Sequence, residues 1–240
     1  VSATRTPQSI TAVPGSVTVI MRQEIEIQTA LTATRDLGEM LPKLVPGLAV
    51  GSQSMDSYSQ TLRGRAVSIL IDGVPQSVNP TNFRDFMRID PSAIERIEVI
   101  RGATAIYGEG ATGGIINIIT RKAAKGETHY TTDVGANVST THAGDSLGGN
   151  IAQYISGKGD GFDYTVNAAI SQTGGLFDAE GDRTMPGADD IGSFADSKTL
   201  TLLGKIGWDI GNQRVALSAN HYGFEQDSSY TPDPASGADK

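Results

Sequence analysis

The residues with the most recognisable chemical spacing are Gly108, Gly110 and Gly113, which match the G-x-G-x-x-G pattern of dinucleotide-binding proteins. Glu127 follows at about the separation at which such proteins place an acid on the ribose. In that motif the third glycine opens a helix, because the helix N-terminus binds the pyrophosphate. Here the residues after Gly114 read IINIIT, a β-branched run that predicts a strand. A nucleotide-binding oxidoreductase is therefore an alternative that its own sequence context disfavours.

Other residue types that carry chemistry are absent or scattered. The chain has no cysteine, which excludes disulfides, thiolate nucleophiles and cysteine-bound metals. Its three histidines, His129, His142 and His221, are widely spaced and form no metal-binding or catalytic pattern. These residues therefore provide no candidate catalytic residue and no candidate resident metal site.

One segment, residues 174–197, is strongly acidic and contains a single basic residue, Arg183. Its acids are Asp178, Glu180, Asp182, Asp189, Asp190 and Asp196. The DAEGD run spaces its oxygen ligands two residues apart, as calcium loops do, and would also suit divalent cations that bridge lipopolysaccharide. A solvated acidic loop is the simpler interpretation, since most acidic runs have no more specific role.

Two apolar segments must position the glycine-rich stretch. Residues 95–100 (ERIEVI) and 115–120 (IINIIT) are rich in β-branched residues, and we predict that they form strands buried on both faces. Further strands are expected at residues 16–20, at 49–53 after a Pro46-Gly47 turn, and at 67–71 before an Asp72-Gly73 turn. A short helix is expected over residues 36–44, with Asp36 as its N-cap and Pro42 inside it.

Residues 94–121 contain an ordered set of residues that resembles the end of the plug domain of TonB-dependent outer-membrane receptors. The set is Glu98, Arg101, Gly102, Tyr107, Gly108, Gly113, Gly114, Ile116, Asn117 and Ile118. Within that family, VPGLAVGSQS and LRGRAVSILIDGV are most similar to ferric siderophore receptors of the aerobactin type, which bind hydroxamate and carboxylate chelates. The resemblance implies an α+β plug, a small mixed sheet with short helices, followed by a transmembrane β-barrel of about 22 antiparallel strands.

The second half of the chain carries the alternation that a barrel requires. Apolar and polar residues alternate over 130–138, 162–170, 200–208 and 215–224, with a change of phase that predicts a bulge near Asn220. Residues 151–158 are placed as a strand from their neighbours. Short turns at 158–161 and 211–213 alternate with longer loops at 140–148 and 174–197, as in outer-membrane barrels.

A change in charge marks the predicted domain boundary. Residues 1–127 are close to neutral, and the net charge of −8 comes from residues 128–240. We therefore predict a plug domain at 1–127 and the first five or so barrel strands at 128–240. Because Lys240 would then lie in an extracellular loop, the sequence is expected to be a truncated or cleaved chain.

The resemblance implies a function and a set of partners. The function is TonB-dependent uptake of a ferric siderophore across the bacterial outer membrane, in which iron is carried as the ferric chelate and TonB remodels the plug. The implied partners are TonB, the ferric siderophore, the outer membrane with its lipopolysaccharide, and a colicin or phage, but no nucleic acid. Receptors of the same fold for haem, vitamin B12 or a catecholate siderophore remain alternatives.

The resemblance also implies three groups of site residues. The ligand-binding group lies in two polar loops and comprises Asp56, Tyr58, Asn82, Phe83 and Arg84. The group that locks the plug to the barrel wall comprises Arg63, Glu98 and Arg101. The group that TonB captures by strand addition comprises Val1, Ser2, Ala3 and Thr4, for which a frayed terminus is the alternative.

Overall fold

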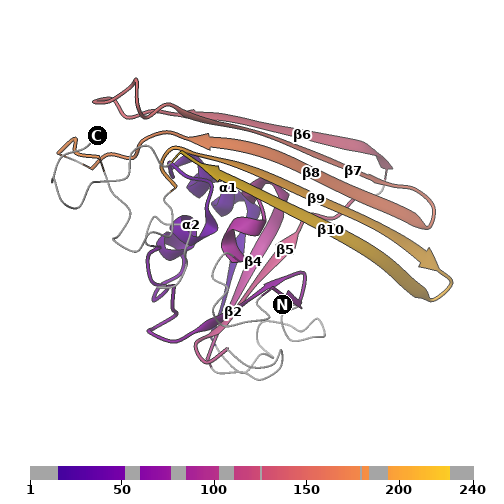
Figure 1. The fold of residues 1–240 in the computed structure, drawn as a ribbon. Coiled ribbons are helices and arrows are strands. Elements are labelled where there is room, and N and C mark those ends of the chain that lie inside the picture. The colour runs from indigo at the N-terminus through magenta and orange to yellow at the C-terminus, as the bar shows by residue number, and fades with distance from the viewer. Residues whose placement is uncertain are drawn as a thin grey trace.

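The computed structural model describes residues 16–51, 60–76, 85–102, 111–124, 126–178, 180–183 and 194–227. They form two five-stranded sheets with strand orders β1-β4-β5-β2-β3 and β10-β9-β8-β7-β6. We call residues 16–124 the N-terminal domain and β6–β10 the C-terminal sheet. Figure 1 shows the N-terminal domain against one face of this long sheet. No helix among the described residues is both long enough and apolar enough to cross a membrane.

The N-terminal domain is built around two central strands. Its elements are β1 Ser16–Met21, α1 Arg22–Ala30, α2 Leu37–Leu44, β2 Val67–Ile71, β3 Val74–Pro75, 3-10 turns at Asp85–Arg88 and Pro91–Ala93, β4 Ile94–Arg101 and β5 Gly114–Thr120. β4 pairs antiparallel with both β1 and β5, while β2 runs parallel to β5. All seven residues of β5 are buried. The prediction of two buried strands on either side of the glycine-rich stretch is confirmed.

Helix α2 shows how the sequence accommodates a proline inside a helix. Asp36 caps the helix by accepting a hydrogen bond from the Glu39 amide at 3.2 Å, as predicted. Pro42 has no amide hydrogen, so the carbonyl of Gly38, four residues earlier, loses its helical donor. The Gln60 side chain supplies a substitute, because its Nε2 donates to the Gly38 oxygen at 2.5 Å. A side chain at Gly38 would collide with Gln60, so glycine is required for this contact.

Two predictions for the N-terminal domain need correction. Helix α1 was not expected, because its sequence, RQEIEIQTA, buries a single side chain, Ile25, and so has no apolar stripe. The strand expected at 49–53 is wrong for residues 49–51, which lie outside any strand; only Leu48 pairs, through an isolated bridge to Leu62. The rest of that segment lies outside the described residues.

The C-terminal sheet is a simple antiparallel meander. Its strands are β6 Gly126–Asn137, β7 Gly148–Lys158, β8 Phe162–Thr173, β9 Ser197–Ile210 and β10 Gln213–Gln226, and each pairs with the next. Alternate residues face opposite sides: Val134 is 73 % exposed on the outer face, whereas Asn167 is 2 % exposed on the face toward the N-terminal domain. The predicted strands and the order of short and long connections are confirmed, and the predicted alternation is confirmed for β6, β8 and β9.

The predicted bulge near Asn220 is wrong. The β9–β10 ladder runs without a register shift from Gln213 opposite Ile210 to Gln226 opposite Ser197. The change of phase in the sequence reflects exposure instead, since residues 213–221 of β10 are exposed at every position. The irregularity in this sheet lies between β6 and β7, near Gly126.

The cap of α2 makes the stability of the N-terminal domain depend on pH. Burial, with a contribution from the negative Glu39, raises the pKa of Asp36 to about 7. Because the folded state then binds this proton more tightly than the unfolded chain, the stabilisation is complete below about pH 4 and is lost as the pH rises through about 7. Asp36→Asn keeps a capping side chain but cannot ionise.

We therefore expect Asp36→Asn to match the wild type in free energy of unfolding at pH 5 and to exceed it by on the order of 1–3 kcal/mol at pH 8. Denaturant unfolding of the complete protein at both pH values measures this difference. A variant that is less stable than the wild type at pH 8 would show that the charged carboxylate is the better cap.

Candidate functional site

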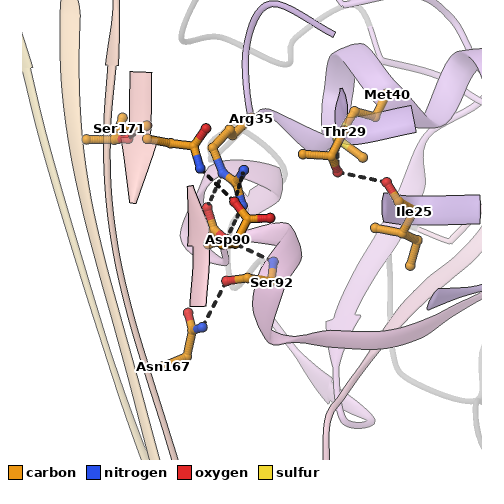
Figure 2. Close-up of polar contacts among 11 residues, drawn as sticks. Ile25, Thr29, Arg35, Met40, Asp90, Ser92, Asn167 and Ser171 are labelled. Carbon is orange, nitrogen blue, oxygen red and sulfur yellow. Dashed lines mark hydrogen bonds and ion pairs between the residues drawn. The ribbon is translucent and has the colours of Figure 1, made fainter. Parts of the chain in front are cut away.

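The interface between the N-terminal domain and the C-terminal sheet centres on one arginine. Arg35, in the turn between α1 and α2, donates from Nε and Nη2 to the two carboxylate oxygens of Asp90, both at 2.8 Å. Its Nη1 donates to Oδ1 of Asp133 on β6, at 3.0 Å. Asn150 of β7 donates to the same oxygen at 2.7 Å. The Arg35 guanidinium therefore links a carboxylate of the N-terminal domain to a carboxylate of the C-terminal sheet (Figure 2).

Electrostatic attraction keeps Arg35 and Asp90 ionised, although both side chains are largely buried. Burial alone would raise the pKa of Asp90, but hydrogen bonds and charge from Arg35, with the hydroxyl and amide of Ser92, outweigh burial and lower it. Burial likewise opposes the charge of Arg35, yet its contacts with Asp90 and Asp133 raise its pKa. Asp90 is 6 % exposed, so it needs this arginine to remain charged.

Ser92 forms the second contact between the two parts. It follows Pro91 in a 3-10 turn that Asp90 caps, because the Ser92 amide donates to the Asp90 carboxylate at 2.8 Å. The cap orients the Ser92 hydroxyl toward the sheet, where it accepts a hydrogen bond from Nδ2 of Asn167 on β8 at 2.9 Å (Figure 2). The same turn thus places both Asp90 and Ser92 at the interface.

Arg121, just after β5, makes the third contact. Its guanidinium carbon lies 3.7 Å from the centre of the Tyr154 ring on β7, within the range of a cation–π contact. Its Nη2 donates to the Thr131 hydroxyl on β6 at 3.2 Å. Thr131 and Tyr154 are opposite each other in the β6–β7 ladder, so Arg121 binds a neighbouring pair.

Two further contacts reach β9 and β10. Lys205 of β9 donates to the Asp72 carboxylate and the Thr120 hydroxyl. Asp72 lies in a left-handed conformation (φ 49°) in the β2–β3 turn and accepts from the Thr120 amide at 3.0 Å, which fixes its carboxylate. On β10, Asn220 donates to the Arg88 carbonyl at 2.8 Å, beside an apolar contact of Met87 and Phe194 with Tyr222 and Phe224.

The contacts between these interface residues were not predicted, for reasons that differ between the two parts. On the sheet side, Asp133, Asn167 and Lys205 are polar residues on the inward phase of alternating strands, so the alternation did mark them as facing the interior. In the N-terminal domain, Arg35 and Arg121 belong to no motif. Their partners lie up to 98 residues away, so only the tertiary fold brings them together.

The three predicted lock residues occupy different positions. Arg63 lies in a left-handed turn (φ 54°), and its amide donates to the Gly47 carbonyl at 2.7 Å. Glu98 is fully buried and forms an ion pair with Arg96 at 2.8 Å. Arg101 donates to the Thr18 hydroxyl on β1 at 2.7 Å. These contacts lie within the N-terminal domain, and the role of all three residues in holding a barrel wall stays a prediction.

The other predicted site residues lie outside the described part of the chain. They are the ligand-binding group Asp56, Tyr58, Asn82, Phe83 and Arg84, and the TonB-coupling group Val1, Ser2, Ala3 and Thr4. Among the described residues, no group of three or more His, Cys, Asp or Glu side chains is placed to hold a metal ion.

The glycines of the G-x-G-x-x-G pattern have a packing role where they are described. A Cβ at Gly113 would lie 2.6 Å from the Arg65 carbonyl oxygen, and one at Gly114 would lie 2.2 Å from the Ile100 carbonyl oxygen. β5 begins at Gly114, where a dinucleotide site needs a helix. Asn117 on that strand is buried and accepts from the Gly73 amide at 3.0 Å. Gly113 and Gly114 therefore let β5 insert between β4 and β2.

A cavity of about 410 Å³ adjoins the Arg35 contact. It lies between α1 and the inward faces of β6, β7 and β8, and its lining includes Arg22, Glu26, Arg35, Asp133, Asn150 and Tyr154. The interface therefore combines direct polar contacts between the two parts with a cavity beside them.

Comparison with known proteins gives three kinds of match. The sequence profile of the TonB-dependent receptor plug domain matches residues 9–115. The rhizobactin receptor of Rhizobium meliloti is 34 % identical over 234 residues, and the ferric aerobactin receptor of Klebsiella pneumoniae is 34 % identical over 238 residues; each match covers 96 % of this chain and 31 % of the relative. The chain thus spans about a third of the length of these relatives.

Solved structures share the fold. The siderophore receptor PirA from Pseudomonas aeruginosa matches with a TM-score of 0.63 at 23 % identity, over 88 % of this chain and 34 % of its own. A mutant of the ferric enterobactin receptor PfeA from the same organism matches with a TM-score of 0.65 at 24 % identity, over 91 % of this chain and 33 % of its own. In both, the match extends across the N-terminal domain and the C-terminal sheet.

The Arg35 contact predicts a large effect of a single substitution. Arg35→Ala leaves Asp90 buried without its cation, so we expect the free energy of unfolding of the complete protein to fall by about 3–5 kcal/mol. Glu26→Ala is the matched control: it removes the partner of an exposed ion pair with Arg22 and should cost less than about 1 kcal/mol. Denaturant unfolding compares the two, and equal effects would contradict the central role of Arg35.

Proposed function

We propose that this chain, whose residues 9–115 match the TonB-dependent receptor plug domain, forms the N-terminal part of an outer-membrane transporter for a ferric siderophore. The observation that carries this proposal is the extent of the matches. The rhizobactin and ferric aerobactin receptors align with 96 % of this chain, including the C-terminal sheet. The hemin receptor of Yersinia enterocolitica and the vitamin B12 transporter of Photobacterium profundum align with 52 % and 50 % of it.

The ligand in this proposal is an iron chelate of the hydroxamate–carboxylate type. The residues proposed to bind it are Asp56, Tyr58, Asn82, Phe83 and Arg84, which lie outside the described part of the chain. Arginine suits this role because its guanidinium binds carboxylates with two parallel hydrogen bonds. The chelate crosses unchanged, so the proposal includes no catalytic step.

The energy in this proposal comes from TonB, which would capture residues 1–4 by strand addition and pull on the chain. The first described element after those residues is β1, an edge strand that pairs with β4 alone. A force on the N-terminus therefore acts first on the six paired residues of β1. An edge strand is the element of a sheet that separates with the fewest broken bonds.

Arg101 offers a test of the proposed lock. If Arg101 ties the plug to a barrel wall, Arg101→Ala in the complete receptor should speed amide hydrogen exchange throughout β1, β4 and β5. If it ties β1 to β4 alone, through its bond to Thr18, exchange should rise in β1 and β4 next to that bond and nowhere else. This second pattern would show that Arg101 does not hold the barrel wall. It would also remove the main reason to propose that role for Arg63 and Glu98.

The proposed function is tested by uptake in cells. The complete receptor is expressed in bacteria that lack their own siderophore receptors and are starved of iron. We expect ferric aerobactin or ferric rhizobactin to support iron uptake, and haem, vitamin B12 and ferric enterobactin to fail. Uptake should be lost in an otherwise identical strain without TonB. Uptake of haem or ferric enterobactin in place of both hydroxamate–carboxylate chelates would assign another ligand to the receptor.

A further inference from the structure

A second, smaller cavity also borders Arg35, between the N-terminus of α2 and strands β8 and β9. Its volume is about 40 Å³, whereas about 10–15 Å³ is enough to hold one water molecule. Hydroxyl groups make up much of its lining, including those of Thr34, Ser171, Thr173 and Thr201. The carboxylate of Asp36 also lines this space, which we call the Asp36 cavity.

Three buried oxygen atoms that line the Asp36 cavity have no hydrogen-bond partner among the described residues. They are Oγ1 of Thr34, Oδ2 of Asp36 and Oγ1 of Thr201. Thr34 is 6 % exposed and Thr201 is 9 % exposed. In the described part of the chain these three are half of the six buried side-chain atoms that lack a partner. Buried polar atoms are nearly always bonded in native proteins, so we expect the cavity to contain their partner.

The two carboxylate oxygens of Asp36 have different surroundings. Oδ1 caps α2, since it accepts a hydrogen bond from the Glu39 amide at 3.2 Å. Oδ2 is buried at the cavity and receives no hydrogen bond from the described residues. A buried carboxylate that keeps its charge needs a cation or hydrogen-bond donors near its free oxygen. The negative charge of Glu39, on the first turn of α2, increases this need.

Arg35 borders the cavity, but its positive charge is already balanced by other groups. Its Nε and Nη2 donate to Asp90, and its Nη1 donates to Asp133. One guanidinium therefore faces two carboxylates before Asp36 is counted. This excess of negative charge favours a cation in the cavity over a neutral water molecule. A proton on Oδ2 of Asp36 would cancel one charge, but both threonine hydroxyls would still lack a partner.

The lining atoms fit a hard cation with a single charge. Hard cations take oxygen ligands, and carboxylate and hydroxyl oxygens line this cavity. Because Asp90 is bound by Arg35, Asp36 supplies the one free carboxylate oxygen, which matches a monovalent ion. A divalent ion usually takes several acidic ligands, and no group of three or more His, Cys, Asp or Glu in the described ranges could hold one.

We propose that the Asp36 cavity binds a sodium ion through Oδ2 of Asp36 and the hydroxyl oxygens of Thr34 and Thr201, with water completing its coordination. The ion joins the N-cap of α2 to β9, so it links the N-terminal domain to the C-terminal sheet beside Arg35. The inference does not depend on the proposed function, because it involves neither the ferric siderophore nor TonB. Bound sodium stabilises the docked arrangement, and this stabilisation grows with the sodium concentration.

Amide hydrogen exchange in the purified complete receptor tests the site without a transport assay. Exchange is followed at pH 8 in sodium chloride and in N-methyl-D-glucamine chloride of equal concentration, whose organic cation is too large for this cavity. Opening of the α2 cap releases the ion, so bound sodium should slow exchange of the α2 amides. We expect a slowing of about tenfold when the sodium concentration is ten times its dissociation constant.

Two variants and a control locate the effect. Thr201→Val removes a ligand on β9 and leaves the cap of α2 intact, whereas Asp36→Asn removes the charge and keeps a capping side chain. Both variants should exchange at nearly the same rate in the two salts. Thr165→Val is the matched control, because Thr165 is a buried threonine of β8 that does not line the cavity. It should keep the wild-type response to sodium.

Equal exchange of the wild type in the two salts would show that the cavity holds water only and would overturn the inference. A full response to sodium in Thr201→Val or Asp36→Asn would overturn it as well, because the ion would then act elsewhere. The gain in stability expected for Asp36→Asn at pH 8 applies without sodium. Added sodium should reduce that gain, because only the wild type binds the ion, and a gain that is independent of sodium would contradict the site.

Discussion

The contact on which the rest of the structure depends is the guanidinium of Arg35 between Asp90 and Asp133. It joins the 3-10 turn of the N-terminal domain to β6 of the C-terminal sheet through charged hydrogen bonds. A buried ion pair of this kind contributes little net stability, because desolvation offsets most of the attraction. It specifies geometry instead: the two parts dock in one register, and water can replace the contacts when they separate.

The distribution of apolar residues supports a separable interface. The largest buried cluster belongs almost entirely to the N-terminal domain, and Leu203 is its single member from the C-terminal sheet. Apart from Leu203 and the small contact of Met87 with Phe194, Tyr222 and Phe224, the contacts described above between the two parts involve polar or charged groups. The N-terminal domain therefore has a core of its own, which is compatible with the movement that the proposed function requires.

Local patterns predicted most of the fold. β-branched residues identified β4 and β5, and alternation of apolar and polar residues identified β6, β8, β9 and β10, whereas β7 was placed from its neighbours. Helix α1 was not predicted because its sequence has no apolar stripe. Tertiary contacts stabilise it instead: Ile25 is buried in the core, and Arg22 donates to the Ile94 carbonyl at 3.0 Å. The Arg35 and Arg121 contacts were not predicted because a charged residue outside any motif looks the same in sequence whether it faces solvent or a partner on another element; Asp133 lies 98 residues from Arg35.

The proposed function requires the N-terminal domain to move relative to the C-terminal sheet while the ligand crosses. A cleavable thiol cross-linker between Ser92→Cys and Asn167→Cys, whose native side chains are hydrogen-bonded across the interface at 2.9 Å, tests it most directly. The same linker between Asp163→Cys and Arg214→Cys, both in the C-terminal sheet, serves as the control. The account predicts that closing the Ser92–Asn167 link stops uptake of ferric siderophore without affecting its binding, and that cleaving the link restores uptake. Uptake at the wild-type rate with that link closed would contradict it.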